Sequence, residues 1–153
     1  MSKTQQKKLA NMLKKFTKLF RGKLGSYPHK KMHLHVDKKD LQQLKFQRPY
    51  PIPRSNYELF LKELDYLVKL GVLEPVQGLV DFAAPTFLVP KPNGTARWVS
   101  DFRALNKIIK RKVYPLPKIN DILKKRTGYS FLTKLDISMQ FYTFELDEES
   151  KDL

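Results

Sequence analysis

An asparagine–glycine turn between two β-type runs constrains the fold of this chain most strongly. Residues 86–91 and 95–101 are rich in β-forming side chains, and Pro92-Asn93-Gly94 separates them. Because Asn-Gly tolerates the positive φ of tight hairpin turns, the pattern predicts a two-stranded antiparallel ribbon. We expect Trp98 in the returning strand to pack beneath this ribbon, since an indole ring buries a large apolar area.

Two cations flank the turn. Lys91 and Arg97 are predicted to face each other near the tip of the ribbon. A lysine offers a point charge and an arginine a planar fork, a combination suited to the β- and γ-phosphates of a nucleotide. The alternative is an ordinary edge ribbon that carries basic residues for solubility.

Periodic apolar residues predict three helices. The first covers residues 4–20 and has one narrow apolar face. The second starts at a capping box formed by Ser55 and Glu58 and ends at Gly71. The third covers residues 118–126, after Pro117 at its first position. The side chains expected to face inward in this third helix are Ile119, Ile122 and Leu123.

Three further β-type runs are predicted at residues 31–36, 130–137 and 141–146. A bend is expected between the last two runs at Met139 and Gln140, and Asp147 suits the start of a helix. Helices and antiparallel strands together indicate an α+β fold.

Residues 48–54 hold three prolines and are expected to be extended. They mark the boundary between a basic connector with an amphipathic helix, residues 1–45, and a main unit, residues 46–153.

The positive charge is concentrated in two blocks. The net charge of the chain is +15; residues 1–54 hold 15 Lys and Arg against 2 Asp and Glu, and residues 91–134 hold 12 against 2. Such blocks attract polyanions, because neutralising phosphates releases counterions. Cysteine is absent, which excludes disulfides and thiolate metal sites and is compatible with a reducing interior. No apolar stretch is long enough to span a membrane, so no membrane partner is expected.

A lone carboxylate is the candidate metal ligand. Asp136 ends an apolar run, where the main-chain carbonyl of Ile137 is placed to face the same metal. Mg²⁺ prefers oxygen ligands and needs only one or two carboxylates beside substrate phosphates. A turn-capping role for Asp136 is the alternative. Of the three histidines, His33 and His35 share one strand face, but only Asp37 lies near them in sequence, and a metal site there is not expected.

These motifs, in this order, resemble a known family. The segments at residues 69–75, 89–107, 114–117 and 135–138 closely resemble reverse transcriptases of gypsy-type long-terminal-repeat retrotransposons. The resemblance covers residues 46–153, and residues 1–45 look like the connector that precedes the polymerase in such polyproteins.

The resemblance implies a role for each candidate residue. Lys91 and Arg97 match the fingers residues that grip the incoming triphosphate, and Asp136 matches the first catalytic aspartate of a ferredoxin-like palm, with Ile137 beside it at the metal. The remaining matches are Phe141, an aromatic gate against ribonucleotides, and Asp101 and Arg103, which support the nucleotide pocket and the template. The implied cofactor is Mg²⁺, and the implied partners are deoxynucleoside triphosphates and an RNA/DNA template-primer.

The family's Asp-Asp turn, which carries its other catalytic aspartates, is missing from this sequence, as are the remaining palm, the thumb and the ribonuclease H domain. We therefore expect a truncated piece that is inactive alone, because removing metal ligands removes the site. Three carboxylates are weighed as substitutes and not favoured: Glu145, Asp147 and Asp152.

Two other functions remain open from the sequence. One is a basic module that binds nucleic acid without chemistry, with steep salt dependence and indifference to Asp136→Ala. The other is a piece that docks on an intact polymerase through an apolar edge.

Overall fold

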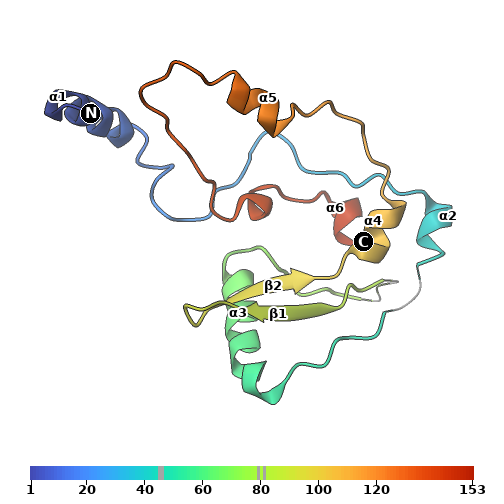
Figure 1. The fold of residues 1–153 in the computed structure, drawn as a ribbon. Coiled ribbons are helices and arrows are strands. Elements are labelled where there is room, and N and C mark those ends of the chain that lie inside the picture. The colour runs from blue at the N-terminus through green and yellow to red at the C-terminus, as the bar shows by residue number, and fades with distance from the viewer. Residues whose placement is uncertain (45–46, 79, 81) are drawn as a thin grey trace. The chain divides into compact units, whose positions relative to one another are not determined.

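The computed structural model describes residues 1–44, 47–78, 80 and 82–153 (Figure 1). These residues form two compact units, Met1–Lys31 with Asp136–Glu145, and Met32–Leu135 with Leu146–Leu153. The boundary expected between residues 45 and 46 lies outside the described residues.

The first unit begins with helix α1, Lys3–Lys14. Ser2 caps it, and the side chain of Gln5 returns a bond to the backbone N–H of Ser2, so a full capping box starts the helix. The helix is shorter than the predicted span of residues 4–20, and turns follow it. None of its residues is buried, and a helix without packing partners has little to extend it.

The rest of the first unit is a turn docked on Tyr27. The backbone N–H of Tyr27 donates to the carbonyl of Thr143 at 2.7 Å, and its ring lies 5.1 Å from that of Phe144. Met139 takes a left-handed φ of 55° and introduces a 3₁₀ turn, Gln140–Thr143, so the expected bend is confirmed. The strand predicted at residues 141–146 is wrong, because this turn consumes its first residues.

The second unit contains the predicted hairpin. Strands β1, Thr86–Pro90, and β2, Ala96–Ser100, pair antiparallel, with Thr86 opposite Ser100 and Pro90 opposite Ala96. Gly94 sits in the turn at a φ of +78°, a region that favours glycine. The ribbon is therefore closed by the residues that predicted it.

Helix α3, Tyr57–Lys69, runs across the direction of the two strands (Figure 1). The ring of Phe60 on α3 stacks 4.9 Å from Trp98 on β2, which confirms that the indole packs beneath the ribbon. The helix ends before Gly71, as predicted, with a φ of +70° at this glycine. The buried apolar residues of the unit are Leu67, Phe82, Ala96 and Leu105.

The start of α3 differs from the prediction. A 3₁₀ turn, Arg54–Asn56, leads into the helix, and Asn56 is its N-cap without a side-chain cap bond. The hydroxyl of Ser55 lies 3.5 Å from the side-chain oxygen of Asn56 instead of capping the amide of Glu58. The predicted capping box is wrong, because Ser55 lies inside the turn that follows Pro53.

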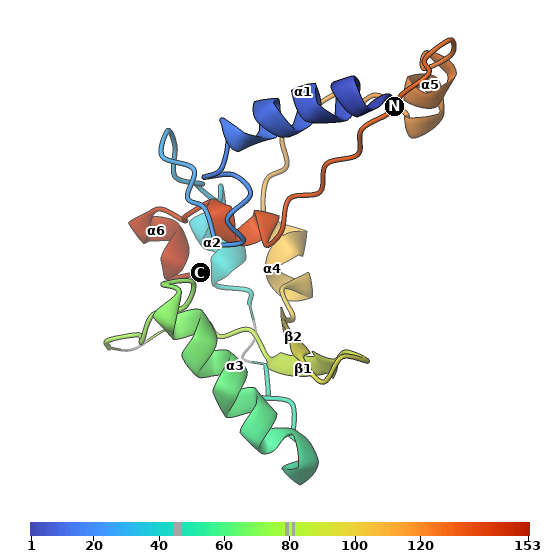
Figure 2. The same ribbon diagram turned by 90° about the vertical axis from the view of Figure 1, so that its left-hand side faces the viewer.

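Residues 109–135 follow a long irregular path on either side of helix α5, Ile119–Lys124 (Figure 2). The helix is shorter than predicted, and Pro117 precedes its N-cap, Lys118. Its apolar side chains are exposed, not inward: Ile119 is 74%, Ile122 38% and Leu123 63% exposed. The strand predicted at residues 130–137 is absent, because no described segment pairs with its backbone.

The strand predicted at residues 31–36 reduces to one bridge, Met32 to Leu146. Short helices follow at α2, Lys38–Leu41, α4, Arg103–Ile108, and α6, Glu148–Lys151, and Asp147 caps α6 as expected. The fold class is α+β. Across the described ranges the one sheet is β1–β2, so the palm-type sheet stays a prediction. No helix within those ranges is long and apolar enough to cross a membrane.

Candidate phosphate-binding hairpin

The strand register places the two cations of the hairpin on one face. Lys91 lies opposite Thr95, whose carbonyl accepts its backbone N–H at 2.8 Å, and Arg97 pairs with Val89. Lys91 and Arg97 thus share one face across the turn, as predicted, although neither is the direct cross-strand partner of the other. They are diagonal neighbours on the same face, a separation of about 7–8 Å between backbone positions that long side chains easily bridge.

The two faces of the ribbon differ in what they touch. Leu88 and Trp98 point to the face that packs on α3 and are at least half-buried. Phe87 and Val89 share the other face with Lys91 and Arg97, and all four are exposed. A solvent-facing surface of two cations beside apolar groups is suited to a ligand with phosphates and a flat ring.

A buried carboxylate fixes the base of the hairpin. Asp101, directly after β2, accepts bonds from Nε and Nη2 of Arg103 at 2.8 and 2.6 Å, and its side chain is only 10% exposed. The hydroxyl of Tyr50 donates to the same carboxylate at 2.8 Å, and the Tyr50 ring lies edge-on to Phe87. The proline-rich segment is thereby tied to the ribbon.

These hydrogen bonds shift the pKa values of both Asp101 and Arg103. The hydrogen bonds from the Arg103 side chain, and then from Tyr50, hold the pKa of Asp101 far below its ordinary value. The carboxylate in turn raises the pKa of Arg103 above its already high value. Asp101 is thus ionised and fully engaged within the fold. Sequence reasoning missed Tyr50, which lies 51 residues away along the chain.

The remaining candidate residues lie in the first unit. Asp136 and Ile137 are exposed on an irregular segment, not at a strand end, and Ile137 is 63% exposed. Phe141 is 91% exposed, so it is not a core residue of this unit. The structure therefore groups Lys91 and Arg97 in one unit and Asp136 and Phe141 in the other.

The described residues do not make a complete Mg²⁺ site. They contain no group of three or more His, Asp or Glu side chains placed to hold one ion. Asp136 and the Ile137 carbonyl offer two ligand groups, which is too few for the cation without further carboxylates or phosphates. We derive no chemical step through a metal.

Two of the three carboxylates weighed as substitutes, Glu145 and Asp147, have other partners. Glu145 accepts from the hydroxyl of Ser26 at 3.2 Å and lies 3.8 Å from the Lys31 ammonium. Asp147 accepts from the Ser150 backbone N–H and lies 2.7 Å from Nδ1 of His33. Bonds from Ser150, and then His33, lower the pKa of Asp147 despite partial burial. This partner of His33 is 114 residues away, and no sequence signal pointed to it.

Comparisons with known proteins point to retroelements. The chain is 35% identical over 95 residues to the polyproteins of transposons Tf2-3 and Tf2-4 of Schizosaccharomyces pombe, a match that covers 62% of the chain and 7% of each polyprotein. The chain thus spans less than a tenth of the length of these relatives. No family model matches it.

Two solved structures share its fold. A prototype foamy virus protease-reverse transcriptase superposes with a TM-score of 0.79 over 98% of this chain and 20% of that protein, at 24% identity. A foamy viral protease-reverse transcriptase in complex with dsDNA gives a TM-score of 0.62 over 98% of this chain and 31% of that protein, at 23% identity. The chain is therefore similar in sequence and in fold to parts of retroelement polyproteins.

Proposed function

We propose that this chain is part of an RNA-directed DNA polymerase of a gypsy-type retrotransposon. Its hairpin acts as the fingers element that holds the triphosphate of an incoming deoxynucleotide. The observation that carries this proposal is the exposed pair Lys91 and Arg97 on one face of a ribbon whose other face is packed on α3. The similarity to Tf2 polyproteins and the foamy virus fold supports it.

The hairpin supplies charge and position. Nucleotidyl transfer depends mainly on positioning and on neutralising phosphate charge, so two cations on a rigid ribbon are the useful contribution. The diagonal placement lets Arg97 take two phosphate oxygens and Lys91 a third. Asp101 and Arg103 support this pocket by fixing the base of the ribbon to Tyr50.

Asp136, Ile137 and Phe141 complete the proposal. The Asp136 carboxylate and the Ile137 carbonyl are the oxygens that would hold Mg²⁺, which neutralises phosphate charge when bound. The exposed ring of Phe141 is free to contact a sugar and to exclude a 2′-hydroxyl by its bulk. The partners are a deoxynucleoside triphosphate, an RNA/DNA template-primer and the polymerase parts that carry further carboxylates.

The first test is nucleotide binding. We expect Lys91→Ala and Arg97→Ala each to weaken binding of a labelled deoxynucleoside triphosphate by about 10- to 100-fold, the value of a charge-assisted hydrogen bond. Lys62→Ala, at an exposed position of α3, removes the same charge and is the control, with less than about a threefold effect. Affinity is measured by equilibrium dialysis. Equal losses of affinity in all three variants would show that the hairpin attracts the nucleotide only through nonspecific positive charge.

The second test is primer extension on an RNA template with Mg²⁺ and deoxynucleotides, with the chain and its Asp136→Ala variant. No extension by either protein is expected, because the described carboxylates do not complete a metal site. Extension that disappears in Asp136→Ala would show that the chain completes the site by itself and would overturn that expectation.

A second candidate function is nucleic-acid binding without chemistry. The dense positive charge of residues 1–54 favours it, as does α1, none of whose residues is buried. This function predicts affinity that falls steeply with salt and is unchanged by Asp136→Ala. Nucleotide binding that depends on Lys91 distinguishes the first function from this one.

A further inference from the structure

Two segments of the second unit run side by side and form an open pocket. The backbone N–H of Lys110 donates to the carbonyl of His35 at 2.8 Å, and the Lys110 ammonium pairs with Asp37 at 2.7 Å. The pocket between the segments has a volume of about 410 Å³. Its lining residues are His33, His35, Val36, Asp37, Lys110, Arg111 and Lys112.

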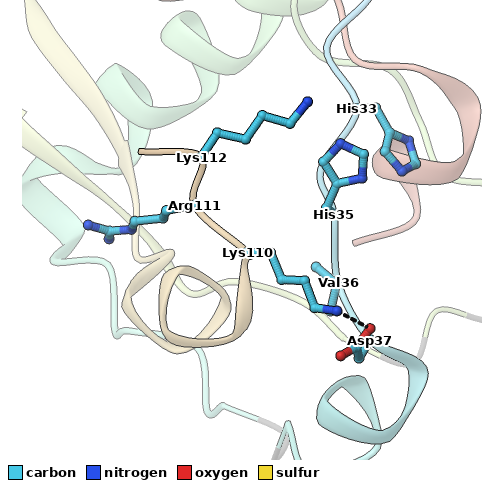
Figure 3. Close-up of a pocket in the computed structure, with 7 residues that line it drawn as sticks. All are labelled: His33, His35, Val36, Asp37, Lys110, Arg111 and Lys112. Carbon is cyan, nitrogen blue, oxygen red and sulfur yellow. Dashed lines mark hydrogen bonds and ion pairs between the residues drawn. The ribbon is translucent and has the colours of Figure 1, made fainter. Parts of the chain in front are cut away.

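The side chains alternate along the 110–112 segment, so two of its three cations share a side. Figure 3 shows Lys112 reaching toward the rings of His33 and His35, and Lys110 reaching toward Asp37, while Arg111 points the opposite way. The two imidazole rings lie edge to face, 4.5 Å apart. A cation and two imidazoles therefore converge on one side of the pocket.

The charges favour an anion. With Arg111 pointing away, two lining side chains are cationic, Lys110 and Lys112, and one, Asp37, is anionic. Asp37 is already paired with Lys110, so the charge of Lys112 is left for a ligand. Lys112 and the imidazole N–H groups are donors suited to phosphate oxygens, which accept several bonds at once. Asp147, which holds Nδ1 of His33, orients that ring and leaves Nε2 for a ligand.

The pocket is open to solvent. Tyr114 follows its last lining residue, Lys112, by two positions, and the Tyr114 side chain is 77% exposed. An exposed ring two residues from a phosphate-binding lysine gives a stacking platform for a base beside a site for its backbone. An open groove with this arrangement fits a strand that passes through better than an enclosed small ion.

We propose that the pocket between residues 33–37 and 110–112 binds a backbone phosphate of single-stranded nucleic acid. Lys112 and His35 contact the phosphate, His33 is positioned by Asp147, and Tyr114 stacks on a neighbouring base. This site shares no residue with the hairpin, so it goes beyond the proposed function and stands or falls separately.

The first experiment measures anisotropy of a fluorescein-labelled 20-nucleotide single strand with the full chain, in the absence of deoxynucleotides. Lys112→Ala is expected to weaken binding by about tenfold or more, as the loss of a charge-assisted bond does. Arg111→Ala is the matched control, because it removes the same charge one residue away from a side chain that points out of the pocket. It is expected to cost less than about threefold. Equal losses from both variants overturn the proposal.

The second readout tests the histidine that contacts the phosphate. An imidazole N–H can donate to a phosphate oxygen, so His35→Ala is expected to weaken strand binding at constant pH. An unchanged affinity in that variant contradicts a role for His35.

The third measurement separates a strand from a free phosphate. Histidine side-chain signals are followed by nuclear magnetic resonance while either the strand or inorganic phosphate is added. We expect the His35 signal to move with the strand at micromolar concentration and to stay in place with equimolar inorganic phosphate. Saturation by inorganic phosphate at the same concentration would assign the pocket to a free phosphate and overturn strand binding.

Discussion

Residues 82–105 and residues 113–135 have similar apolar content but differ in how much of it is buried. In the first region Phe82, Ala96 and Leu105 are buried. In the second, Val113 is fully exposed, and Leu116 and Leu132 are 79% and 78% exposed. Both regions carry strand-type sequence, yet only the first forms strands.

The difference shows that a run of β-forming residues becomes a strand only where a neighbouring strand can pair with its backbone. In the hairpin the partner strand lies across a short turn, so the hydrogen bonds of each strand are satisfied locally. Residues 130–137 have no paired strand among the described residues, and their apolar groups remain in solvent. Sheet propensity measures fit to neighbours, and here the neighbours are missing.

The largest expected effect is on proteolysis. Trypsin is expected to cut at Lys125 and Arg126, just after α5, orders of magnitude faster than at Arg97, because exposed irregular backbone opens at almost no free-energy cost while a packed strand must unfold. Mass spectrometry of timed digests gives the order of cuts, and digestion in urea is the control. First cleavage at Arg97 would reverse the comparison.

The next effect is on stability. Leu67→Ala is expected to lower the free energy of unfolding by about 2–5 kcal/mol, because the Leu67 side chain on α3 is 1% exposed. Leu132→Ala makes the same chemical change at an exposed position and is expected to cost less than about 0.5 kcal/mol. Urea unfolding followed by the fluorescence of Trp98, the single tryptophan, measures both. Similar costs would show that residues 113–135 are packed in solution.

A smaller effect separates two glycines with nearly equal backbone angles. Gly94 has a φ of +78° and Gly128 one of +82°, and neither has an atom close to an added Cβ. Gly94→Ala is expected to cost about 1 kcal/mol through backbone strain in the turn. Gly128→Ala is expected to leave the Trp98 unfolding transition unchanged, because its segment can relax. A loss at Gly128 as large as that at Gly94 would place it in a rigid turn.

The smallest effect appears only in acid. Because the folded pKa of Asp101 is depressed, its contribution to stability is complete above its ordinary pKa of about 3.9 and is lost as the pH falls through the lower folded value. The wild-type unfolding midpoint is therefore expected to fall below about pH 4 more steeply than that of Asp101→Asn. Arg103 stays charged throughout. Parallel pH profiles of the two proteins would mean that the bonds seen at Asp101 do not hold in solution.

The sequence predicted the features that depend on neighbouring residues and did not predict the contacts between distant segments. The Asn93-Gly94 turn, the packing of Trp98 and the end of α3 at Gly71 all follow from neighbouring residues. The Lys91 and Arg97 pair was found, but its diagonal register depends on hydrogen bonds that the sequence does not display.

The contacts that sequence reasoning missed join distant segments. Tyr50 with Asp101 and His33 with Asp147 have no spacing that marks them, because they form only when the chain has folded. The pocket at Lys110 and Lys112 was likewise not predicted, because it lies in a run of basic residues. Which of their side chains point into the pocket depends on the extended backbone of that run.

The bond between His33 and Asp147 also has a consequence in time. Its partners are 114 residues apart, whereas Thr86 and Ser100 at the open end of the hairpin are 14 apart. At roughly 5–20 residues per second, a ribosome makes the hairpin in about 1–3 s but needs about 6–23 s between His33 and its partner. The hairpin can therefore form during synthesis long before His33 acquires Asp147, and the histidine pocket is among the last features of this chain to mature.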